Sequence, residues 1–79
     1  MSQNFNYSSI LESIQKTFPF CISRKEAERV TGGLLSPKYL ANLDSQKKGP
    51  GGRIRSGRKI AYLTPSFCQW LADRLKVES

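Results

Sequence analysis

A cluster of basic residues in the second half of the chain offers the most specific chemistry in this sequence. No aspartate or glutamate occurs between Ser45 and Ala72. Six lysines and arginines fall in that interval: Lys47, Lys48, Arg53, Arg55, Arg58 and Lys59. The chain of 79 residues has a formal net charge of +7. Because cations that are not interleaved with acids create a one-sided positive field, the cluster indicates an anionic partner, with nucleic acid first and an acidic membrane surface second.

Glycines punctuate this cluster, in the run Gly49-Pro50-Gly51-Gly52 and again at Gly57. Glycines can cradle phosphates, but the GxxxxGK[ST] pattern of a P-loop is missing and no strand-to-helix junction follows the run. The apolar residues Ile54, Ile60 and Tyr62 recur around Gly57 instead. This recurrence predicts a folded β-hairpin over Arg53 to Tyr62 and argues against a disordered basic tail.

The register of the hairpin is predicted by requiring one apolar face and one basic face. A two-residue turn at Ser56-Gly57 would pair Ile54 with Lys59 and mix apolar with basic residues. A three-residue loop from Ser56 to Arg58 pairs Ile54 with Ile60 and Arg55 with Lys59, so we expect this register. The two cations then repel across the strands, a cost that an anionic partner would remove.

Residue types for catalysis or metal binding are scarce. The chain contains no histidine, which is the commonest general base. The two cysteines, Cys21 and Cys68, lack the spacing of a zinc site, and we expect them to be small buried side chains and not a disulfide. We therefore expect no enzyme activity, cofactor, metal ion or small-molecule ligand.

Four helices are predicted to position the hairpin. We expect them over Ser8–Phe18, over Arg24 to about Thr31, over Pro37–Ser45, and over Pro65 to about Lys76. The second opens with a capping box of Ser23 and Glu26, with Ala27 and Val30 facing inward. Ser36 and Thr64 are the expected caps of the last two. Gly32-Gly33 should end the second helix in a left-handed turn, which makes a helix-turn-helix pattern with the third.

Chain length allows one small domain. We expect a flexible N-terminus over residues 1–7 and a single folded domain over residues 8–79. No apolar run approaches the roughly 20 residues of a membrane span. The N-terminal residues also lack the basic start and apolar stretch of a signal peptide, which favours a cytoplasmic location.

The order of these motifs resembles a known family. The runs ISRKEAERVTG, SPKYLANL, KGPGG, GRKIAY and TPSFCQWL are similar to those of the AlpA and excisionase group, small winged helix-turn-helix proteins of phages and prophages. The similarity covers Ile22 to about Leu75. It departs from the usual pattern at Gly32-Gly33-Leu34-Leu35, a turn about one residue longer, and in the last helix, which has no acid in its first turn.

The resemblance implies an α+β fold, mostly α: a winged helix-turn-helix with a two-stranded antiparallel hairpin as the wing and an extra N-terminal helix. It implies sequence-selective binding of double-stranded DNA in a bacterial or phage cytoplasm, associated with the nucleoid. The protein would act as a recombination directionality factor that bends DNA, or as a transcriptional regulator. An integrase or recombinase, or another copy of the chain on DNA, is a further partner that it suggests.

The candidate contacts combine the third helix with the hairpin. The N-terminus of a helix attracts phosphate, and asparagine can bond adenine. The DNA-binding candidates are Arg24, Ser36, Lys38, Tyr39, Asn42, Lys47, Lys48, Arg53, Arg55, Arg58 and Lys59. The alternative is a protein-interaction module in which the basic hairpin docks an acidic protein.

Overall fold

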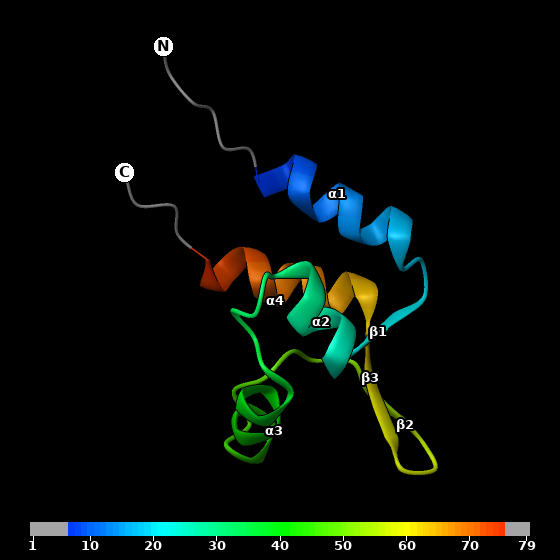
Figure 1. Cartoon of the computed structure of the whole chain (residues 1–79), viewed down its shortest axis with the longest axis vertical. Helices are drawn as coiled ribbons and strands as arrows, with labels where there is room; N and C mark the ends of the chain where they lie inside the picture. The colour runs from blue at the N-terminus through cyan, green and yellow to red at the C-terminus, as the bar shows by residue number, and fades with distance from the viewer. Residues whose placement is uncertain (1–6, 76–79) are drawn as a thin grey trace.

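The structure is a computed structural model that describes residues 7–75 (Figure 1). Within this range the elements are α1 (Tyr7–Thr17), β1 (Cys21–Ser23), α2 (Arg24–Val30), α3 (Pro37–Ser45), β2 (Arg53–Ser56), β3 (Lys59–Leu63) and α4 (Thr64–Arg74). The predicted α+β class is confirmed. The first six residues of the expected flexible N-terminus lie outside the described residues, and α1 already begins at Tyr7.

Local signals account for α2 and α3. The Ser23 side chain accepts from the Glu26 N–H at 3.1 Å, and the Glu26 carboxylate accepts from the Ser23 N–H at 3.3 Å, which completes the predicted capping box. Ser36 accepts from the Tyr39 N–H at 3.1 Å, as an N-cap does. Gly32 and Gly33 have φ values of 64° and 89°, so the predicted left-handed end of α2 is confirmed.

The strands form one antiparallel sheet in the order β1-β3-β2. The strand β1 was not predicted, because three residues are too few to show an alternating pattern. It pairs Ile22 with Tyr62, and both side chains are fully buried. The sheet therefore joins the segment before α2 to the hairpin.

The predicted hairpin register is wrong. Ser56 pairs with Lys59, Arg55 with Ile60, and Ile54 with Ala61. The turn therefore consists of two residues, Gly57 and Arg58, and Gly57 has the φ of 63° that a type II′ turn requires at its first central position. Ile54 and Ile60 are only half-buried, so pairing them would gain little, whereas glycine at the first central position fits the two-residue turn.

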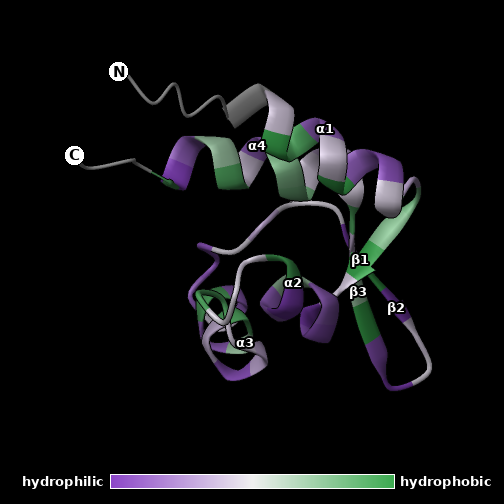
Figure 2. Ribbon diagram, turned by 45° about the horizontal axis from the view of Figure 1, so that its top comes forward, coloured by the Kyte–Doolittle hydropathy of each residue, from purple (hydrophilic) through white to green (hydrophobic). Residues whose placement is uncertain are grey.

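The core lies where α1, α4, the sheet and the inner sides of α2 and α3 meet (Figure 2). Its fully buried side chains include Ile22, Leu40, Tyr62, Phe67 and Leu71. Hydrophobic residues concentrate there, and hydrophilic residues cover the outer sides of α2 and α3 and the tip of the hairpin.

Two details of the predicted helices are wrong. Val30 is 38% exposed and does not face the core; Leu35, in the following turn, is buried instead. Thr64 does not cap α4, which begins at Thr64 itself after Leu63 without a side-chain cap. Thr64 is buried beside β1, where its N–H donates to the Phe20 carbonyl at 3.0 Å. No helix within residues 7–75 has the length and apolar character to cross a bilayer.

Candidate functional site

The α3 helix and the tip of the β2–β3 hairpin project from one end of the molecule, opposite α1 and α4 (Figures 1 and 2). Most of the predicted site residues are exposed on these two elements or between them. They are Lys38, Tyr39, Asn42, Lys47, Lys48, Arg53, Arg55, Arg58 and Lys59. We refer to this set as the basic end.

Burial orients α3 within the basic end. Leu40 and Leu43 are buried, so Lys38 and Asn42 lie on the outer side, as expected. Ser36 is half-buried, and its hydroxyl is engaged as the cap of α3. The outer side of α3 therefore presents a cation and an amide, which can bond phosphates and base edges.

Tyr39 belongs to a surface stack that the sequence did not reveal. Its hydroxyl accepts a hydrogen bond from the Arg74 guanidinium, whose carbon lies 5.6 Å from the Tyr39 ring centre and 5.1 Å from that of Trp70. The Trp70 indole donates to the Lys48 carbonyl at 3.0 Å. The C-terminal part of α4 thus contacts the first turn of α3 and the segment that follows α3, through cation–π and hydrogen-bond contacts.

A buried carboxylate connects α3 to α2 and to the hairpin. Asp44, with its side chain only 6% exposed, accepts from Arg24 and from the Tyr62 hydroxyl, each at 2.6 Å through the same oxygen. Arg53 approaches that oxygen to 3.6 Å. The Arg24 Nε also donates to the Tyr62 hydroxyl at 3.0 Å. These contacts form a closed network, in which the removal of one partner leaves buried polar groups unsatisfied.

The network shifts the pKa values of two of its members. Burial, with a hydrogen bond to Asp44, raises the pKa of Tyr62 to about 12, although Arg24 opposes the shift. Burial alone would lower the pKa of Arg24, but its hydrogen bonds with Tyr62 and Asp44 raise it above the ordinary value. Tyr62 is therefore a neutral donor and Arg24 a cation at neutral pH.

The structure consequently gives Arg24 a different setting from the other candidates. Its guanidinium is bound inside the protein, and its side chain is 20% exposed. Arg24 positions α3 relative to the hairpin through Asp44. Nothing in the sequence indicated the pairing, because the two residues lie 20 positions apart on different helices.

Close packing explains two of the punctuating glycines. A Cβ at Gly49 would lie 2.1 Å from the Asp44 Oδ1, so any other residue would have to displace this carboxylate. A Cβ at Gly52 would lie 2.7 Å from the Ser66 hydroxyl, and Gly52 also has a φ of 69°. These glycines fit the hairpin closely against α3 and α4.

Lys47 ends α3 in an unusual conformation. It has a φ of 61°, in the left-handed region where glycine is usual. Its N–H donates to the Asp44 carbonyl at 3.0 Å, and the Lys48 N–H donates to the Leu43 carbonyl at 2.8 Å. This is the bonding of a Schellman motif with lysine at the glycine position.

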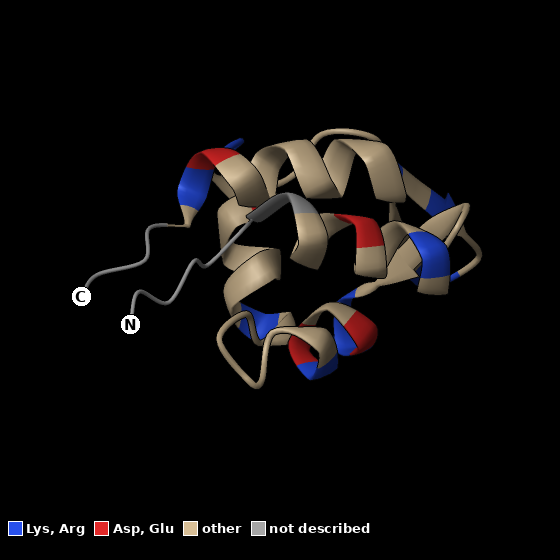
Figure 3. Ribbon diagram, turned by 90° about the horizontal axis from the view of Figure 1, so that it is seen from above, with Lys and Arg blue, Asp and Glu red and all other residues tan. Residues whose placement is uncertain are grey.

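Acidic residues are arranged differently from the basic end. In the described range they lie on the helices, at Glu12, Glu26, Glu28, Asp44 and Asp73, and none lies on the hairpin. Figure 3 views the molecule from the end with α1 and α4, where acidic and basic residues mix along the helices. The field of the hairpin is therefore positive, with Asp44 buried beneath it.

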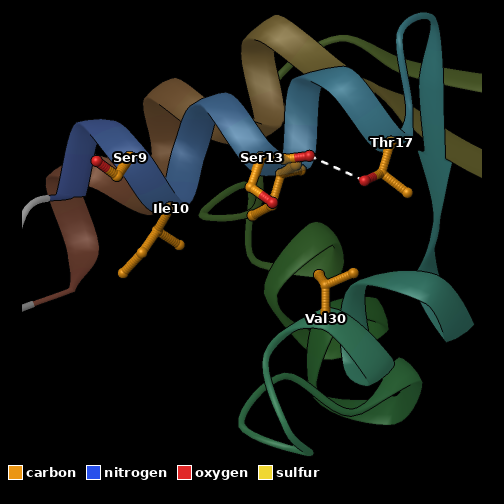
Figure 4. Close-up of a pocket in the computed structure, with 6 residues that line it drawn as sticks. Ser9, Ile10, Ser13, Thr17 and Val30 are labelled. Carbon is orange, nitrogen blue, oxygen red and sulfur yellow. Dashed lines mark hydrogen bonds between the residues drawn. The ribbon is translucent and has the colours of Figure 1, made fainter.

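The other candidate sites offer less chemistry. A groove of about 470 Å³ lies between α1 and α2 and is lined by Ser9, Ile10, Ser13, Ile14, Thr17 and Val30 (Figure 4). It holds no charged side chain. Cys21 and Cys68 are free thiols, and burial raises the pKa of Cys68. No group of His, Cys, Asp or Glu within residues 7–75 could hold a metal ion.

Comparisons with protein-family models, with curated proteins and with solved structures find no match to this chain.

Proposed function

We propose that the protein is a winged helix-turn-helix module that binds double-stranded DNA. The α3 helix enters the major groove with Lys38 and Asn42 outward, while Tyr39 stays in its stack with Arg74. The β2–β3 hairpin is the wing that contacts the flanking backbone or minor groove. One observation carries the proposal: α3 and a hairpin with four exposed cations project from the same end and are joined through Asp44.

The arrangement of charges supports this function, because cations on two projecting elements can contact the phosphates of a grooved polyanion such as duplex DNA. Two elements that must engage one ligand together need a fixed relative position, and the Asp44 network supplies it before binding. With about six phosphate contacts, the slope of log K against log salt is expected to be about −5. This slope distinguishes phosphate binding from an apolar interaction.

The role on DNA follows from the resemblance of the motifs and is part of the proposal. An excisionase-like protein bends its site and acts beside an integrase or another copy of itself. An AlpA-like regulator acts on transcription. A bending assay on a selected site separates the two, because an excisionase should curve its substrate.

Fluorescence titration of a labelled duplex tests the function. Arg55→Ala combined with Arg58→Ala should weaken binding to every duplex, because phosphate contacts are independent of sequence. Asn42→Ala should weaken binding to the selected site alone. Lys16→Ala is the control for loss of an exposed cation outside the basic end, because Lys16 is exposed on α1, which lies opposite α3 and the hairpin tip.

The rival function is docking of an acidic protein by the basic hairpin. It uses the same cations but needs no contribution from α3. Absence of duplex binding by the wild-type protein at low salt would overturn the DNA-binding proposal and favour the rival.

A further inference from the structure

A cleft between α2 and the β2–β3 hairpin gathers basic side chains from two elements that are distant in sequence. It has a volume of about 550 Å³ and is lined by Ser23, Arg24, Lys25, Arg58, Lys59 and Ile60. No acidic residue lines it. Lys25 was not among the candidates that the sequence suggested, since it lies in a helix with mixed charges and only the fold brings it to the hairpin.

The charges in this cleft are not all balanced within the protein. The Arg24 guanidinium is neutralised by Asp44. The nearest carboxylate in sequence, Glu26, is held by the Ser23 N–H and hydroxyl at 3.3 Å and 3.2 Å. Lys25, Arg58 and Lys59 are exposed and form no ion pair within residues 7–75. Uncompensated like charges around one cleft favour an anionic occupant.

The position of the cleft specifies that anion, provided that the proposed function holds. In both Figure 1 and Figure 2, α2 lies between α3 and the hairpin. With α3 in the major groove and the hairpin on the flanking duplex, the DNA strand that runs from one to the other passes the cleft. Its ligand is then a single phosphodiester of that strand.

We propose that this cleft binds one backbone phosphate, held jointly by Lys25 of α2 and Arg58 of the hairpin turn. Arginine offers a fork of donors to phosphate oxygens, and lysine supplies a point charge on the opposite side. The shared phosphate couples α2 to the tip of the hairpin when DNA is bound. This inference deepens the proposed function and rests on it.

Whether the two cations share one phosphate can be measured from the salt dependence of DNA binding. Each neutralised phosphate contributes about 0.9 to the slope of log K against log salt. If Lys25 and Arg58 hold the same phosphate, either one alone still neutralises much of it, so each single variant changes the slope only slightly. Loss of both should reduce the slope by about 0.9, whereas two separate phosphates would give about 1.8.

The experiment measures these slopes for wild type, Lys25→Gln, Arg58→Gln and the double variant on one duplex. The matched control is Lys25→Gln with Arg55→Gln, because Arg55 lies on the same hairpin but does not line the cleft. We expect the slope changes to be additive in the control pair and non-additive in the Lys25/Arg58 pair. Circular dichroism should show all variants folded, since the substituted side chains are exposed.

The outcomes separate the two proposals. Wild-type binding with a steep salt slope supports the DNA-binding function. Additive changes for Lys25 and Arg58, or no change in the double variant, would then overturn the shared phosphate alone. No wild-type binding to duplex at low salt would overturn both.

Discussion

The lysine that ends α3 leads to a quantitative prediction about stability and function. Lys47 has a φ of 61°, although glycine is usual at this position of a Schellman motif. The left-handed conformation costs a residue with a Cβ about 1 to 2 kcal/mol. Replacement by glycine should remove this cost while keeping both backbone hydrogen bonds of the motif.

The net gain is smaller than the strain, because glycine makes the unfolded chain more flexible. That entropic cost is about 0.5 to 1 kcal/mol. We therefore expect Lys47→Gly to raise the free energy of unfolding by about 0.5 to 1 kcal/mol. In a domain of this size the melting temperature should rise by about 2 to 8 °C.

Two variants separate the backbone effect from the charge effect. Lys47→Ala removes the same charge but keeps a Cβ in the left-handed conformation, so it should not be stabilised. Lys48→Gly places glycine one residue later, where φ is not positive, and should lose about 0.4 to 1 kcal/mol. Urea and thermal unfolding followed by Trp70 fluorescence give all three values.

The outcome that refutes this reasoning is a Lys47→Gly protein no more stable than Lys47→Ala. Binding provides the second half of the test. If Lys47 contacts a phosphate, both Lys47 variants should lower the salt slope of DNA binding by about 0.9. A more stable protein that binds DNA less well would explain why a strained lysine occupies a glycine position.

Three further predictions concern the contacts that hold α3. Burial raises the pKa of Tyr62 from 10.0 to about 12, so as pH rises the hydroxyl ionises first in the unfolded chain. The contribution of Tyr62 to the free energy of unfolding is therefore fully present below pH 10 and should fall by about 2 to 3 kcal/mol up to pH 12. Tyr62→Phe should lack this part of the loss in urea unfolding at the two pH values, and an identical loss in both proteins would contradict the assignment. Gly49→Ala places a Cβ 2.1 Å from an Asp44 oxygen. By displacing that carboxylate it should lower the free energy of unfolding by about 1 to 3 kcal/mol, measured from the urea midpoint. An unchanged midpoint would show that the loop moves freely. Arg74→Ala removes the cation beside Trp70 and should lower the free energy of unfolding by about 0.5 to 1 kcal/mol. The fluorescence emission of this single tryptophan should also shift. Unaltered emission and stability would mean that the stack contributes nothing.

The sequence by itself determined the parts of this protein that depend on neighbouring residues. The capping box at Ser23 and the serine cap before Pro37 act over three residues, and the left-handed glycines end α2 within the same short span. Each satisfies backbone groups that have no other partner, so residue type and spacing suffice to predict it. The separation of basic from acidic residues is likewise a property of the linear chain, since the cations are neighbours in sequence.

Tertiary structure decided the features that require a partner from elsewhere in the chain. The hairpin register was predicted wrongly because the fold leaves Ile54 and Ile60 only half-buried, so pairing of these two residues did not set the register. The Thr64 cap was predicted wrongly for a similar reason. The Thr64 N–H donates to the carbonyl of Phe20, which is distant in sequence, and the Thr64 side chain is buried. The link between Arg24 and Asp44 leaves no local pattern at all. Burial and pairing between residues far apart in sequence stabilise the protein only once the chain has folded and brought those residues together. A local sequence pattern therefore cannot reveal them.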